Sequence, residues 1–109
     1  MSGAVTDRKK KRHPYGIFIL PTGSKYCGER DEDGNISGKG VCQYKNGDIY
    51  LGFWSQNTRE GKGKYTFANG DVYEGDWLDN KMTGKGTYKW ANGESYSGYW
   101  FDGHMLAKI

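Results

Sequence analysis

The chain lacks the long apolar runs and the paired cysteines that would place it in several large protein classes. Its longest apolar stretch is Ile17-Phe18-Ile19-Leu20, which is too short for a membrane span or for the core of a secretion signal. We therefore expect a cytoplasmic protein. Cys27 and Cys42 have no zinc-knuckle spacing, and a reducing compartment disfavours a disulfide, so we expect both to be reduced filler residues.

Groups that could form a catalytic or metal site are also scarce. His13 and His104 lie near opposite ends of the chain, the carboxylates are scattered, and no serine or cysteine has an obvious base beside it. The ligand clusters that metals require are missing from the sequence. We predict a protein that is not an enzyme and that needs no cofactor.

Positive charge is concentrated at the N-terminus. Of the net charge of +3, residues 1–13 carry +4 (five basic residues against Asp7), which leaves −1 for residues 14–109. The basic residues are Arg8, Lys9, Lys10, Lys11 and Arg12. This tail suits an acidic surface, and a tubulin tail or an anionic membrane is favoured over nucleic acid. The alternative is a solvated, disordered leader.

What the chain has in abundance is glycine and aromatic residues, and they recur with a period of 23 residues. Three copies of Tyr-x-Gly-x-Trp are present: Tyr50, Gly52 and Trp54; Tyr73, Gly75 and Trp77; Tyr96, Gly98 and Trp100. Gly-Lys-Gly and Asn-Gly motifs keep the same period, so we predict units at 38–60, 61–83 and 84–104. Residues 105–109 form the C-terminal end.

A degraded copy of the unit occupies residues 14–37 and follows the tail of residues 1–13. Pro14 stands where the other units have a glycine, and Arg30 replaces the tryptophan. The connector after Arg30 is one residue longer than the others. We interpret this copy as an end unit, because nothing stacks on its outer side.

The position of Asn-Gly predicts how each unit folds. If Ala91-Asn92-Gly93 forms a three-residue loop with Gly93 left-handed, Tyr88 lies opposite Tyr96 and the aromatic signature gathers on one face. A two-residue turn would separate these aromatics. Three residues after each tryptophan, Asn57, Asn80 or Gly103 predicts a turn that ends the second strand.

Tyr-x-Gly-x-Trp followed by Gly-x-Gly and Asn-Gly resembles the MORN repeat (membrane occupation and recognition nexus) over residues 14–104. The resemblance implies an all-β fold, a single-layer antiparallel array of four stacked β-hairpins with a grooved face. It also implies a scaffold, since the family occurs in axonemal radial spoke heads, in cytoskeletal and junctional scaffolds, and attached to lipid kinases and a methyltransferase.

The face opposite the aromatics changes along the chain. In the first two units it is apolar, whereas in the third it carries Lys64, Thr66, Glu74 and Asp76. We predict that the apolar residues bind a partner protein, unless the N-terminal tail folds over them. They are Ile17, Ile19, Val41, Ile49, Leu51 and Phe53.

Two further surfaces follow from the repeat. Lys39, Lys62 and Lys85 recur once per unit and could form a ridge for an anionic partner, or they are ordinary solvated turn residues. The last unit carries Tyr99, Phe101, Met105 and Leu106 near an open sheet end, which could pair with another array.

From these features we expect a scaffold or adaptor subunit of a multiprotein cytoskeletal assembly. The family resemblance favours a ciliary or flagellar axoneme of the radial-spoke-head type. The alternative is a peripheral membrane module that binds anionic phospholipids through the lysines and the tail.

Overall fold

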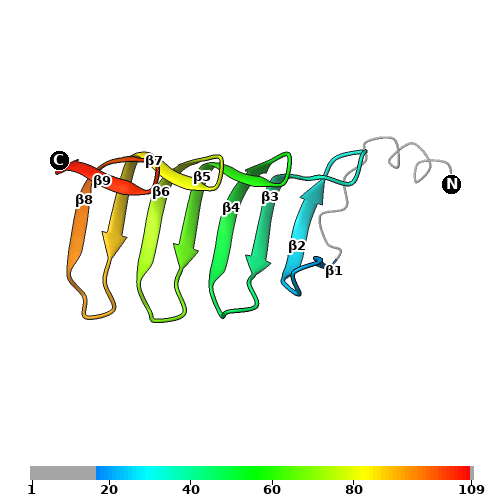
Figure 1. Ribbon diagram of the computed structural model, residues 1–109, viewed down its shortest axis with the longest axis horizontal. Helices are drawn as coiled ribbons and strands as arrows, with labels where there is room; N and C mark the ends of the chain where they lie inside the picture. Colours follow the sequence, from blue (N-terminus) through cyan, green and yellow to red (C-terminus); the bar gives the residue numbers. More distant parts are fainter. Residues whose placement is uncertain (1–16, 109) are drawn as a thin grey trace, which may run out of the picture.

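The computed structural model describes residues 17–108, which form one antiparallel sheet whose nine strands are ordered β1 to β9 as in the sequence (Figure 1). This confirms the all-β array of hairpins. The strands are β1 (Ile17–Ile19), β2 (Lys25–Arg30), β3 (Ile36–Gln43), β4 (Ile49–Ser55), β5 (Thr58–Thr66), β6 (Val72–Leu78), β7 (Lys81–Lys89), β8 (Ser95–Phe101) and β9 (His104–Lys108).

The loop that joins the two strands within each unit has the predicted three-residue form. Trp90 N–H donates to Glu94 O at 2.8 Å, Gly93 has φ of 97°, and Tyr88 lies opposite Tyr96. Because the loop has an odd number of residues, the two aromatic residues point to the same face.

The connectors between units are two-residue turns, as the sequence predicts at Asn57, Asn80 and Gly103. Both turn residues have positive φ in each case, for example 49° at Gln56 and 70° at Asn57. This is the type I′ geometry whose twist matches that of paired strands. The first connector is longer, and Asp31 N–H bonds to Asn35 O across it.

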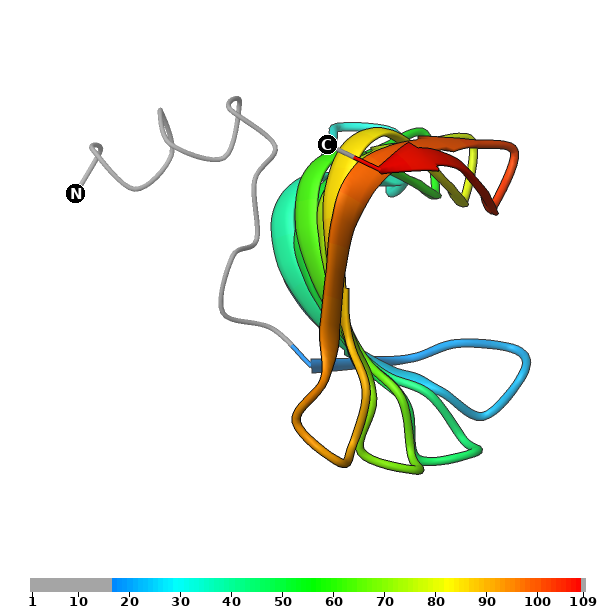
Figure 2. The same ribbon diagram turned by 90° about the vertical axis from the view of Figure 1, so that its left-hand side faces the viewer.

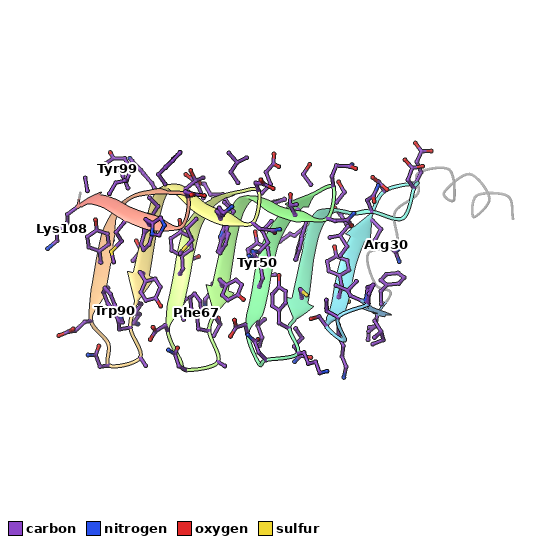
Figure 3. The ribbon with its side chains drawn as sticks, viewed as in Figure 1. Arg30, Tyr50, Phe67, Trp90, Tyr99 and Lys108 are labelled. Carbon is purple, nitrogen blue, oxygen red and sulfur yellow. The ribbon has the colours of Figure 1, made fainter. Side chains whose placement is uncertain are left out.

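The repeated Tyr, Gly and Trp are internal packing parts. The hydroxyl of Tyr50 donates to Phe53 O at 2.9 Å, and the indole N–H of Trp54 donates to Gly40 O at 3.2 Å. The ring of Tyr50 packs edge-on against both Trp54 and Trp77, so it contacts its own unit and the next. The buried core consists of such rings together with Ile36 and Cys42. Figure 3 shows aromatic side chains along the whole array.

Neighbouring units are also joined by a carboxylate. Asp48 accepts hydrogen bonds from Tyr65 Oη at 2.7 Å and from Ala68 N at 2.8 Å in the following unit. Asp71 does the same with Tyr88 and Ala91. Burial raises the pKa of the Asp48 carboxyl, but the hydrogen bonds outweigh burial and hold it below its usual value.

The sheet is curved, so that it has one concave and one convex face, and it measures 54 × 24 × 21 Å (Figure 2). The aromatic face is the concave one, since a single hollow there is lined both by Leu20 and Thr22 of a hairpin loop and by Asn57 and Asn80 of the connector turns. The reverse face is convex.

The sheet continues beyond the last predicted hairpin. Asp102 and Gly103 form the same turn as Gln56 and Asn57, so the chain returns as β9 and pairs with β8. Pairing runs from Phe101 opposite His104 to Gly98 opposite Lys108. The unit boundaries proposed from the sequence stay a prediction, but residues beyond 104 belong to the sheet.

Candidate interaction surfaces

The apolar residues singled out in the sequence lie on the convex face of the first two units. They are exposed to the extents expected of a surface patch: Ile17 71%, Ile19 65%, Val41 37%, Ile49 36%, Leu51 44% and Phe53 45%. Val41 and Leu51 are direct cross-strand partners, and Ile17 is in line with them across Cys27. The structure thus joins residues from β1, β3 and β4 into one surface, the apolar patch.

Two hollows shape this patch. One of about 220 Å³ is bordered by Ile17, Val41 and Ile49. The second, of about 410 Å³, surrounds Leu51 and Phe53 and is bordered by Lys39, Lys62 and Lys64. An exposed apolar surface with concave sites is typical of a contact surface for another molecule.

The patch ends where the third unit begins. At the positions equivalent to Leu51 and Phe53 this unit has Glu74 and Asp76, each 23 residues further along. A separate apolar group occurs at the C-terminal end, where Tyr99, Phe101 and Leu106 are exposed by 42%, 64% and 64%.

The lysines Lys39, Lys62 and Lys85 lie in one line across the convex face, but acidic residues interrupt it. Lys62 forms an ion pair with Asp76 at 2.5 Å. Glu29 Oε1 accepts a hydrogen bond from the backbone N–H of Lys39, and Asp76 Oδ2 accepts one from that of Lys85. Glu29 thus lies beside Lys39 and Asp76 lies beside both Lys62 and Lys85, whereas Phe53 is the cross-strand partner of Lys39. The basic residues Arg8–Arg12 lie outside the described residues.

The concave face is lined by the packed aromatic rings. Burial raises the pKa of the Tyr50 and Tyr73 hydroxyls well above the usual value of 10.0. Burial, followed by the nearby Glu29 carboxylate, raises that of Tyr26 to about 12. These hydroxyls stay protonated and act as hydrogen-bond donors within the fold.

Sequence reasoning missed one residue on this face. Arg59 occupies the position held by Ile36, Met82 and Met105 in the other units. Its guanidinium lies 4.9 Å from the ring centre of Trp77 and 5.2 Å from that of Tyr65. The 23-residue period could have revealed it as a charge at an apolar position.

Within residues 17–108, no group of three or more His, Cys, Asp or Glu side chains could hold a metal ion. Over the same residues, no helix is long and apolar enough to cross a membrane. Burial raises the pKa of the Cys42 thiol, which disfavours a reactive thiolate, and Cys27 is exposed on the convex face. His104 lies in β9, whereas His13 is outside the described residues.

Comparison with known families agrees with this architecture. The MORN repeat family model matches residues 32–49, 50–72 and 73–95, which together cover more than half of the chain. No curated protein matches the chain. MORN repeats are non-catalytic modules that mediate protein or membrane interactions. On its sequence repeats, its stacked hairpins and this match, the chain belongs to the MORN repeat family.

Proposed function

We propose that this protein is a non-catalytic scaffold subunit of a multiprotein cytoskeletal assembly, a ciliary or flagellar axoneme, and that it docks a protein partner on the apolar patch. The patch is the observation that carries the proposal. Its residues are exposed although the sheet has a packed concave core, so they are not needed to hold the fold.

The basic tail would add a second contact in such an assembly. Five positive charges at Arg8–Arg12 suit an acidic protein segment such as a tubulin tail. Two contacts from one chain would raise the overall affinity through effective concentration.

The repeat itself supplies the variant that tests this proposal. Leu51→Glu combined with Phe53→Asp gives the second unit the residues that the third unit already carries at the same positions. We therefore expect the fold to be retained while the patch is lost. Ser97→Glu, at the equivalent exposed position of the fourth unit, adds a carboxylate without removing an apolar side chain.

The measurement is the fraction of tagged protein that stays with axonemes after detergent extraction of flagellated cells. We expect wild type and Ser97→Glu to stay, and the double variant to be released. Retention of the double variant would show that the apolar patch does not bind the partner. Absence of wild type from the axoneme would refute the location.

An anionic phospholipid surface is the second candidate, because three lysines and only one carboxylate, that of Glu74, border the larger hollow beside Leu51 and Phe53. Apolar and cationic side chains together suit the interface of an anionic membrane. Flotation with vesicles that contain phosphatidylserine separates the two functions. Salt-sensitive binding would favour the membrane, and its absence would favour the protein scaffold.

A further inference from the structure

Two arginines break the repeat pattern on the concave face, within the N-terminal half of the array. Arg30 stands where the other units have Trp54, Trp77 and Trp100, and Arg59 stands where they have an isoleucine or a methionine. The fold of the later units shows that neither position requires a cation. The two guanidinium groups therefore call for an explanation beyond packing.

Both arginines border hollows of the groove that have no acidic lining. Arg59 contributes to a hollow of about 340 Å³ with Leu20, Ile36 and Trp54. Arg30 contributes to an adjoining hollow of about 390 Å³, which shares Leu20, Pro21, Ile36 and Asn57 with the first. Among the described residues, neither hollow is lined by a carboxylate, and neither arginine forms an ion pair.

Each guanidinium is held in place and keeps donors in reserve. Arg59 Nη1 donates to Tyr44 Oη at 2.6 Å, and Nη2 donates to Asn80 O at 2.9 Å. Since each of these two nitrogens carries two hydrogens, Nη1 and Nη2 each keep one hydrogen without an acceptor in the described residues. Arg30 donates from Nε and Nη2 to Gly34 O and lies over the Phe18 ring at 4.0 Å, and its Nη1 has no described acceptor. Preorganised guanidinium groups of this kind favour carboxylates.

We propose that the groove between Arg30 and Arg59 binds an extended acidic segment of a partner protein. Arg30 is on β2 and Arg59 is on β5, so three strand-to-strand steps of about 4.8 Å place them about 14 Å apart along the array. An extended chain rises about 3.3 Å per residue, and two carboxylates about four residues apart would reach both arginines. Apolar side chains between the carboxylates would enter the hollows above Ile36 and Trp54.

The charge of the groove decides against the chain's own tail as the occupant. Residues 8–12 are all basic, and their charge would be repelled by the two guanidinium groups. The hollow beside Arg30 is also bordered by Ile17 and Ile19 of the apolar patch, whereas the hollow beside Arg59 has no patch residue in its lining. A substitution at Arg59 can therefore inactivate the groove without changing the patch.

The test uses a fluorescent peptide with the core Asp-Val-Leu-Val-Asp and a matched peptide in which both Asp are replaced by Asn. Binding to the full-length protein is measured by fluorescence anisotropy at low and high salt. We expect the Asn peptide to bind at least tenfold more weakly, since each charge-assisted hydrogen bond contributes substantially. We also expect the affinity of the Asp peptide to fall with salt.

The protein variant is Arg59→Met, which places at this position the residue found in two other units. This variant should bind the Asp peptide at least tenfold more weakly than wild type does, and its affinity for the Asn peptide should be unchanged. Lys64→Met makes the same charge change on the convex face and should have no effect. Leu20→Glu puts a carboxylate into the groove and should also weaken binding, which keeps the test valid if Arg59→Met unfolds.

Four outcomes would overturn the proposal. The first three are equal binding of the Asp and Asn peptides, full affinity in a folded Arg59→Met protein, and an equal loss of affinity in Lys64→Met. Displacement of the Asp peptide by inorganic phosphate at equal concentration would also overturn it, because the site would then recognise a simple anion.

Discussion

Glycine and tyrosine determine each other's positions in every unit of the array. A Cβ built on Gly63 would lie 2.0 Å from the hydroxyl oxygen of Tyr50 and 2.3 Å from the nearest carbon of its ring. Tyr50 is fully buried and makes a hydrogen bond with Phe53 O, so it has no space to move away. The glycine is thus the space into which the preceding unit's tyrosine packs.

Gly63→Ala should therefore destabilise the protein by about 3 kcal/mol, in the upper range for overpacking. The measurement is urea unfolding followed by tryptophan fluorescence. Ser97→Ala, which removes only a solvent-exposed hydrogen bond with Thr87, serves as control and should change stability by less than about 1 kcal/mol. A Gly63→Ala protein with wild-type stability would mean that Tyr50 does not pack as described.

Asp48 has the same kind of residue-scale role, but it acts between units. Asp48→Ala removes the acceptor for Tyr65 Oη and Ala68 N, and hydrogen bonds to a charged group contribute about 1.5–3 kcal/mol. We expect a loss of about 2 kcal/mol at neutral pH by urea unfolding. Glu94→Ala is the matched control, because Glu94 has the same repeat position but no following unit among the described residues.

The pH dependence gives a further check on Asp48. Its folded-state pKa is lowered, so its contribution to the free energy of unfolding is present above the usual value of 3.8. This contribution is lost as the pH falls through the lowered pKa. The difference between wild type and Asp48→Ala should therefore shrink in acid, and a constant difference would exclude the charged hydrogen bonds as its cause.

At the scale of the element, the unit is a hairpin with a two-residue connector, and its two turns serve different purposes. The three-residue loop keeps the aromatic residues of both strands on one face. The connector turn also joins units, since Asn57 N–H donates to Ile36 O and Asn80 N–H donates to Arg59 O. Each unit is thus tied to its neighbour at both ends of its strands.

Because all inter-unit contacts repeat, an entire unit should be removable. Deletion of residues 61–83 joins Glu60 to Gly84 and brings Tyr88 and Ala91 to the positions of Tyr65 and Ala68 beside Asp48. We expect a folded protein with the same circular dichroism per residue. It should be shorter by about 10 Å, two strand spacings, as measured by small-angle X-ray scattering.

Deletion of residues 61–82, one residue fewer, is the control for this prediction. A one-residue slip moves every side chain of the strand to the other face. This variant should lose cooperative unfolding. Equal stability of the two deletions would show that the 23-residue register does not determine which side chains are buried.

At the scale of the whole molecule, the curved sheet separates two kinds of surface. The convex face carries the apolar patch of the first two units, and the concave face carries Arg30 and Arg59 within an aromatic groove. Both distinctive regions lie in the N-terminal half, where the units depart most from the repeat. The more regular C-terminal units extend the array and end in β9, whose residues are all exposed.

The sequence by itself determined the period, the loop type and the face of each repeated residue. These features are local, because strand alternation and the left-handed positions of glycine and asparagine depend on only a few neighbouring residues. The exposed patch from Ile17 to Phe53 could be predicted for the same reason.

Only the tertiary structure decided the bend of the sheet and what the bend brings together. The sequence indicated a lysine ridge, but the pairing of Lys62 with Asp76 depends on which residues face each other across β5 and β6. The aromatic surroundings of Arg59 and the groove it shares with Arg30 need side chains from six strands, β1 to β6, and from the loops and turns between them. Such contacts form across units, and no local pattern specifies them.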